Sequence, residues 1–221
     1  MTDTIINILR SQFHVTNRDV GEFSNITHRG MRFDIRVYDA EDAGSLCIMN
    51  MRAMFGLMKM ETAVFSPVSI DGPLLSCDLV SAFRTDTLFL ELYDTTISHP
   101  KFEQLEDTKT KYSHLPDNDV GTHWYDDIRL PVSVFKKGKN MKAEFELIAG
   151  QFASSYFDEL KCCNPCDENI KKELNEKYVN GLLENGGPAV DQFRKMLGDE
   201  KCERFLKTVM FACSHKADKE G

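Results

Sequence analysis

One carboxylate is notable for the chemistry that its surroundings allow. Asp78 lies in the apolar segment Leu74–Val80, where an ionised side chain is unfavourable unless it is paired or protonated. The side chains of a strand alternate between its two faces, which places Asp78 with Leu74 and Val80. An acid in apolar surroundings has a raised pKa and can donate a proton near neutral pH. The alternative is a strand-end aspartate that accepts hydrogen bonds from backbone N–H groups.

A cluster of cysteines raises the question of a metal site. Cys162, Cys163 and Cys166 occur in the run Cys-Cys-Asn-Pro-Cys, and the chain has seven cysteines in all. An odd number without an export signal favours reduced thiols over a disulfide framework. Structural zinc sites and iron–sulfur clusters need about four ligands, and neither a second C-x-x-C nor an H-x-x-x-H motif completes the set. We therefore interpret these residues as loop thiols and predict no metal.

Four lysines form the most basic segment of an acidic chain. Lys136, Lys137, Lys139 and Lys142 lie close together, although the net charge is −8. The cluster fits either a solvated turn before a helix or a docking patch for an acidic electron carrier. The overall charge disfavours nucleic acid and anionic membranes as partners.

Composition and apolar patterning indicate an ordinary globular chain. The 221 residues are 42% hydrophobic and 28% charged, which suits one domain spanning residues 1–221. No run approaches the ~18 apolar residues of a membrane span, and the first thirteen residues lack the pattern of a secretory signal. We expect a monomeric cytoplasmic protein, or a plastid protein after processing.

The periodicity predicts strands first and helices last. After a helix over residues 4–13, alternating patterns indicate a sheet, a long polar loop over 99–127 and one more strand over 129–135. Helical spacing predicts four helices, the first from about Met141 and the third entered at Pro188, before a polar tail from Ser214 that we expect to fray. No glycine-rich nucleotide-binding motif is present. The strands are predicted at residues 22–28, 31–38, 46–54, 57–65, 74–83 and 87–94, with the last two joined by a turn at 84–86.

This order predicts an α+β fold in which helices cover an antiparallel sheet. The four methionines Met49, Met51, Met58 and Met60 alternate with other residues along two of the strands. Thioethers pack adaptably against flat π-systems, so they fit the lining of a slot for an aromatic ligand. An ordinary core fits them equally well.

The segment around Asp78 resembles a signature of the ferredoxin-dependent bilin reductases. In that signature a strand ends in Phe, a loop carries Asp-x-Pro, and the next strand carries a small residue followed by Asp-Leu-Val. A closing helix pair over 193–211 and the residues His123 and Trp124 resemble the same family, so the likeness extends from about Met49 onward. The matching positions are Phe65, Asp71, Pro73, Cys77, Asp78, Leu79 and Val80.

The resemblance implies a three-layer α/β/α sandwich that holds a bilin between the sheet and the C-terminal helices. It also implies reduction of biliverdin or a related linear tetrapyrrole without a tightly bound cofactor. Reduced ferredoxin or flavodoxin would supply single electrons, bilin radicals would form, and carboxylic acids would donate protons. Asp78 matches the central proton donor of the family.

Other positions follow the resemblance less closely. Glu61 lies seventeen residues before Asp78, where the family usually has His or Asn, and we interpret it as a second proton donor. Met49 replaces a family acid, and Asn185 lies one residue out of register with a family Asn or Asp. The substrate's propionates would need basic partners, for which the candidates are Arg52, Arg84 and Lys111.

Two other functions stay open. One is an enzyme resembling red chlorophyll catabolite reductase, which shares the scaffold and acts on a different tetrapyrrole. The other is a non-catalytic tetrapyrrole carrier, for which the changes at Met49 and Glu61 leave room.

Overall fold

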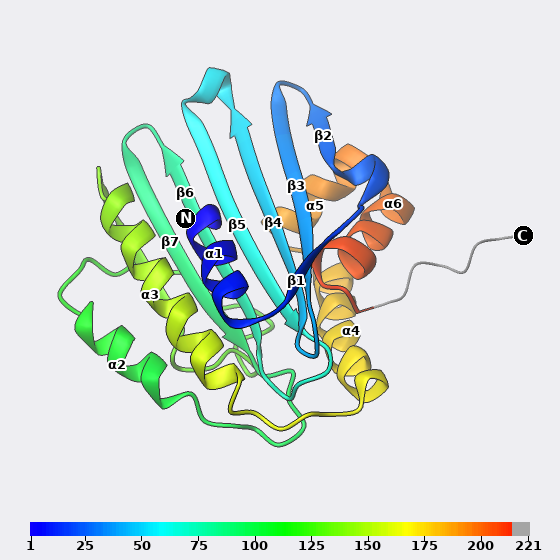
Figure 1. Ribbon diagram of the computed structural model, residues 1–221. Helices are drawn as coiled ribbons and strands as arrows, with labels where there is room; N and C mark the ends of the chain where they lie inside the picture. The colour runs from blue at the N-terminus through cyan, green and yellow to red at the C-terminus, as the bar shows by residue number, and fades with distance from the viewer. Residues whose placement is uncertain (214–221) are drawn as a thin grey trace, which may run out of the picture.

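Helices cover both faces of an antiparallel sheet in the computed structural model, which describes residues 1–213 (Figure 1). The strand order is β1-β3-β4-β5-β6-β7-β8, and β2 pairs with the free part of β3. This arrangement confirms the predicted α+β sandwich with a central antiparallel sheet and C-terminal helices. The strands are β1 Val15–Arg18, β2 Asn25–His28, β3 Met31–Ala40, β4 Gly44–Ala53, β5 Met58–Pro67, β6 Leu74–Ala82, β7 Thr85–Tyr93 and β8 Val134–Lys139.

The helices form two separate layers. On one face α1 and α3 pack against the sheet and α2 packs against α3, around a core that includes Leu75, Cys77 and Phe152. On the other face α4, α5 and α6 pack around a second core that includes Met49 and Phe193. The bounds are α1 Thr2–Gln12, α2 Glu103–Lys111, α3 Lys142–Leu160, α4 Glu168–Asn185, α5 Pro188–Leu197 and α6 Asp199–Arg204, which continues as the π-helix η3 Phe205–Met210.

Period-two alternation located most strands, and the misses have physical causes. β1 has only four residues and no apolar alternation, so it was not predicted. α2 lies inside the segment predicted as a long polar loop. It was not predicted as a helix because it buries only Leu105 and Thr108 and its sequence shows no helical period. The strand predicted over 129–135 begins at Val134 instead, because the chain turns at Leu130, whose carbonyl accepts from Ser133 N at 3.1 Å. The tail predicted from Ser214 lies outside the described residues.

The Asp-x-Pro loop between β5 and β6 joins both helical layers to the sheet. Asp71 accepts hydrogen bonds from Ile97 N at 2.7 Å and Ser98 N at 2.8 Å. The buried ammonium of Lys171, in α4, donates to Gly72 O at 2.6 Å. From the opposite layer, the Tyr156 hydroxyl of α3 donates to Pro73 O at 2.7 Å. These bonds fix the start of β6, the strand that carries Asp78.

The turn between β6 and β7 sets how these strands align. Phe83 and Arg84 form a two-residue turn, with φ of 49° and 68°, the left-handed geometry that matches the twist of a hairpin. Ala82 therefore pairs with Thr85, and Asp78 with Phe89. Among residues 1–213, no helix has both the length and the apolar character that crossing a bilayer requires.

Candidate active site

Asp78 lies in the middle of β6 and projects toward the α4–α6 side of the sheet, as Leu74 does. Thr62 of β5 stands directly opposite, and its hydroxyl donates to Asp78 Oδ1. The Ser76 hydroxyl donates to Oδ2 at 3.1 Å. Burial raises the pKa of Asp78, and these two hydroxyls only partly offset the effect. Its hydrogen-bond partners within the described residues are thus hydroxyl side chains, not the N–H groups of a strand end.

Glu91 of β7 is a second carboxyl on this face. Its partner across the strands is Ser76, two pairs along from the Asp78–Phe89 pair and on the same face. Burial, and after it the charge of Asp78, raise the pKa of Glu91 to about 7, although a hydrogen bond from Tyr93 and the nearby Arg129 oppose the shift. The distance from Arg129 Nη1 to Glu91 Oε1 is 3.5 Å. Glu91 is therefore an acid that holds or releases a proton near neutral pH.

Glu91 was not among the residues predicted from the sequence, although a signal was present. Phe89, Glu91 and Tyr93 alternate with the buried residues Leu90 and Leu92, which is the pattern that identified Asp78. Choosing the correct face for Glu91 also required the β6–β7 register, which depends on the exact turn.

This part of the sheet face is partly open to solvent. Ser76, Asp78 and Val80 of β6 and Phe89 and Glu91 of β7 are half-buried, whereas the alternate residues on the other face are buried. Figure 1 shows α5 and α6 behind the β1–β4 side of the sheet, which leaves less cover over β6 and β7. We call the half-buried residues named here the Asp78 face.

An aromatic cluster borders the Asp78 face next to Glu91. Tyr93 stacks on Tyr178 of α4 with ring centroids 4.6 Å apart, and Tyr125 meets Tyr93 edge-on at 5.4 Å. Trp124 lies 6.0 Å from Tyr178, and a Cβ at Gly181 would come within 2.4 Å of its ring. The absence of a side chain at Gly181 thus lets the only tryptophan pack onto α4. Trp124 and Tyr178 line a cavity of about 600 Å³ on the outer side of the cluster.

Glu61 does not belong to the Asp78 face, and this corrects its expected position beside Asp78. Because Thr62 pairs with Asp78, the adjacent Glu61 projects from the opposite face. There it accepts from Lys142 Nζ and from the Met1 amine, each at 2.8 Å. Burial alone would raise the pKa of Glu61, but these two cations and their hydrogen bonds hold it at about 2. Glu61 is therefore an ionised structural carboxylate, unsuited to proton donation near neutral pH.

The expected substrate-binding residues are scattered. Met49 and Met51 are buried on the side of the sheet that carries Asp78, and Met49 pairs with Thr62. Arg52 is exposed on the opposite side, in the wall of a polar cavity of about 620 Å³. Arg84 lies in the β6–β7 turn. The Asn185 amide donates to Gly181 O at 3.0 Å near the end of α4. The structure thus brings the two methionines toward Asp78, but none of the three polar residues.

Two further basic residues, Lys111 and Arg129, differ in whether they reach the Asp78 face. Lys111 Nζ donates to Gln151 Oε1 at 2.9 Å, away from the sheet. Arg129 reaches the Asp78 face at Glu91, and its guanidinium lies 4.9 Å from the centre of the Phe135 ring. Sequence reasoning gave no signal for Arg129, because its position depends on the irregular segment before β8.

The predicted lysine patch is divided by strand β8. Lys136 is buried, and its ammonium donates to Leu115 O at 3.0 Å and Asp117 Oδ1 at 2.6 Å. The expectation that Lys136 lies on an exposed docking surface is therefore wrong. Lys142 pairs with Glu61, as described, and with Glu146 at 3.4 Å. Lys137 and Lys139 are exposed.

The cysteines form no metal centre in the described part of the chain. No group of three His, Cys, Asp or Glu side chains there is placed to hold an ion. All seven cysteines are free. Burial raises the pKa of Cys163 to about 11, so its thiol is unreactive near neutral pH.

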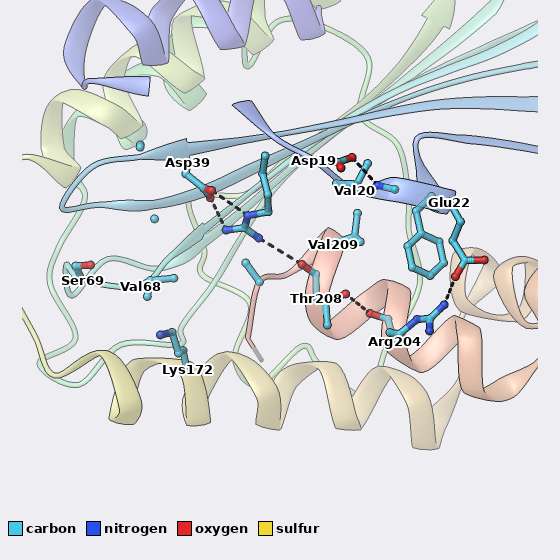
Figure 2. A pocket seen from close by; sticks show the side chains of 16 residues that line it. Asp19, Val20, Glu22, Asp39, Val68, Ser69, Lys172, Arg204, Thr208 and Val209 are labelled. Carbon is cyan, nitrogen blue, oxygen red and sulfur yellow. Dashed lines mark hydrogen bonds and ion pairs between the residues drawn. The ribbon is translucent and has the colours of Figure 1, made fainter. Parts of the chain in front are cut away.

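A separate cavity of about 730 Å³ lies between the β1–β3 edge and η3 (Figure 2). Its wall contains the ion pairs Arg18–Asp39 and Arg204–Glu22. Figure 2 shows Lys172 of α4 across the cavity from Asp39. Opposite charges in this wall pair with each other, and none of the Asp78-face residues lines it.

Comparison with protein-family models finds no match for the sequence. Comparison with curated proteins finds none either. Among solved structures, the chain is similar to the crystal structure of phytochromobilin synthase from tomato in complex with biliverdin. The two share 11% sequence identity with a TM-score of 0.77, over 98% of this chain and 85% of the other. The described chain therefore has the fold of that enzyme.

Proposed function

We propose that the chain reduces a linear tetrapyrrole, biliverdin or a related bilin, on the Asp78 face. The observation that carries the proposal is that two carboxyls with raised pKa values, Asp78 and Glu91, lie on the same partly open face of the sheet. The fold shared with a biliverdin-bound phytochromobilin synthase supports this substrate class. The apolar side chains beside the acids suit a flat conjugated ligand.

The acids fit the proton requirement of such a reduction. Each electron added to a bilin makes the pigment more basic, so two electrons and two protons together give the dihydro product. Asp78 would supply one proton, with Thr62 and Ser76 stabilising the carboxylate that remains. Glu91 would supply the other, in place of the role expected for Glu61. General acids of this kind typically contribute ~10²–10⁴-fold in rate.

The electrons would come singly from reduced ferredoxin or flavodoxin, through bilin radicals and without a tightly bound cofactor. This part of the proposal follows from the family resemblance of the Asp78 segment. It makes the chain an oxidoreductase that depends on a small redox protein.

An anaerobic absorption time course with biliverdin and reduced ferredoxin tests the proposal. We expect roughly 1:1 binding, a spectral shift, a transient radical and then loss of the biliverdin bands. Binding without any further change would indicate the carrier function instead. If no spectral change occurs at tens of micromolar protein, both functions are wrong.

A further inference from the structure

Four apolar side chains are exposed at one end of the sheet. Met54, Phe55 and Leu57 lie in the β4–β5 turn, and Phe83 lies in the adjacent β6–β7 turn. Their exposed fractions are 48%, 109%, 62% and 65%. β5 and β6 pair from Met58 and Ala82 onward, so the two turns are neighbours, as Figure 1 shows. Clustered apolar exposure of this kind marks interaction sites.

The backbone holds these side chains outward in an unfavourable conformation. Met54, Phe55 and Phe83 have φ of 51°, 55° and 49°, the left-handed region that non-glycine residues rarely adopt. Strain of this type persists where the surrounding structure imposes it, and it often marks functional segments. Hairpin turns of this geometry favour Asn, Asp and Gly, so large exposed apolar residues at these positions point to a use outside folding.

A row of cations lies beside the turns. Arg32, Arg52 and Lys59 stand directly opposite one another on β3, β4 and β5. Within residues 1–213, none of the three pairs with an acid. Like charges directly opposite across strands destabilise a sheet, so an anionic partner that covers this row would relieve the repulsion.

Two further cations lie at the same end of the sheet but project from its other face, the one that carries Asp78. Lys139 of β8 pairs with Thr85, next to Arg84, and Lys137 lies two residues before it. Asp86 is buried and accepts from Ser81 Oγ at 2.6 Å and Met141 N at 2.8 Å. The acids that share a cavity with the row already pair with other cations, Asp3 and Asp34 with Arg36, and Glu61 with Lys142. In a chain of net charge −8, this end of the sheet is therefore locally basic.

From these features we infer that the end of the sheet is a docking surface for an acidic protein. Apolar turns at the centre and cations at the rim complement a partner whose apolar contact area is ringed by acids. We call the two turns and the adjoining cations the sheet-end surface. Asp78 lies four residues before Ala82, so the surface is ~13 Å along β6 from the candidate site. If the proposed function holds, the partner is its acidic electron donor.

Binding of a plant-type [2Fe–2S] ferredoxin to the full chain, measured by calorimetry, tests the inference. The variants Arg52→Glu/Lys59→Glu and Phe55→Ser/Phe83→Ser should each raise the Kd about tenfold or more. The wild-type Kd should also rise with salt, and less steeply in the charge-reversed variant, because surface attraction is screened within ~10 Å at 0.1 M salt. Circular dichroism would confirm that each variant is folded.

Matched controls carry the same changes elsewhere. Lys101→Glu/Lys177→Glu reverses two exposed cations outside the sheet-end surface. Ile97→Ser/Ile170→Ser removes two apolar side chains of 46% and 49% exposure. Both controls should bind ferredoxin as the wild type does. If a control weakens binding as much as its counterpart, or if neither sheet-end variant weakens it, the surface is not the docking site. Loss of binding to anionic phospholipid vesicles, with ferredoxin binding unchanged, would likewise overturn the inference.

The inference and the proposed function fail separately. Reduction of biliverdin by dithionite with methyl viologen needs no protein docking, so it tests the Asp78 face alone. Turnover in that assay, with ferredoxin binding insensitive to the sheet-end variants, would overturn the docking surface and leave the function. Variant-sensitive ferredoxin binding without any turnover would do the reverse.

Discussion

Asp78 of β6 and Glu91 of β7 project from one face of the sheet, two residue pairs apart, and Ser76 pairs with Glu91 while its hydroxyl donates to Asp78. The charge of Asp78 raises the pKa of Glu91, so the second carboxyl ionises against the charge of the first. Neighbouring acids that resist ionisation are suited to delivering protons to a substrate that becomes more basic on reduction.

Replacing Asp78 with Asn should stop reduction without preventing binding. The amide keeps the shape and a hydrogen bond but has no transferable acid proton. We expect biliverdin to bind as in the wild type and the reaction to slow ~10²–10⁴-fold, stalling at the starting pigment or at a long-lived radical. Stopped-flow absorption and electron paramagnetic resonance would show this. Reduction by Asp78→Asn at the wild-type rate would rule out Asp78 as the proton donor.

The role of Glu91 predicts a pH dependence. A general acid must be protonated, so the rate of proton transfer should fall as the pH rises through about 7. Glu91→Gln should remove this limb and slow turnover at pH 6. Tyr93→Phe should instead move the limb to higher pH, because the hydrogen bond from Tyr93 lowers the pKa of Glu91. Profiles measured with dithionite and methyl viologen as reductant would avoid pH effects on docking. A limb unchanged in Glu91→Gln would assign it to another group.

Glu91 should also destabilise the fold at high pH. Its folded pKa is raised to about 7 from an ordinary value of 4.5, so the folded chain binds more protons than the unfolded chain between these values. Stability contributed by this group is present below pH 4.5 and is lost as the pH rises through 7. Glu91→Gln should therefore stabilise the chain by about 1–3 kcal/mol at pH 8 and have little effect at pH 4. Urea unfolding at the two pH values would measure the difference, and equal effects at both would contradict the prediction.

Glu61 should show the opposite dependence. Its pKa of about 2 lies below the ordinary 4.5, so its contribution is present above pH 4.5 and is lost as the pH falls toward 2. Glu61→Gln should lower the free energy of unfolding by about 1–3 kcal/mol at pH 7, and the difference should shrink near pH 3. Biliverdin reduction should continue in Glu61→Gln, which separates this structural role from the catalytic role first expected.

Alternation along single strands was enough to predict most of the sheet and to reveal Asp78 as a carboxylate in an apolar strand. Apolar residues at every second position identified six of the eight strands, and one carboxylate among them was visible without knowing its partners. The helical spacing of Phe193 and Phe205 likewise located the C-terminal layer.

The composition of the site depended on register, which a single strand does not reveal. A turn at 84–86 would place Glu91 opposite Leu79, whereas the observed turn places it opposite Ser76. An odd shift in pairing moves a side chain to the other face. Glu61 lies outside the site for a similar reason: its neighbour Thr62 pairs with Asp78, so Glu61 projects from the opposite face. The burial of Lys136 depends on contacts with Leu115 and Asp117, more than fifteen residues away, which local patterns do not predict.

The outer edge of β8 has a consequence for association between copies of the chain. An unpaired strand edge offers N–H and C=O groups to any other extended segment, and so invites aggregation. Here Asn118 N donates to Phe135 O, and Lys137 N donates to Pro116 O, each at 3.1 Å. The loop over 116–118 therefore occupies the backbone positions that a foreign strand would need. Beyond that loop, β8 ends at the exposed Lys139. A charged side chain on an edge strand opposes pairing with another chain, so the β8 edge is protected from intermolecular strand pairing along its length.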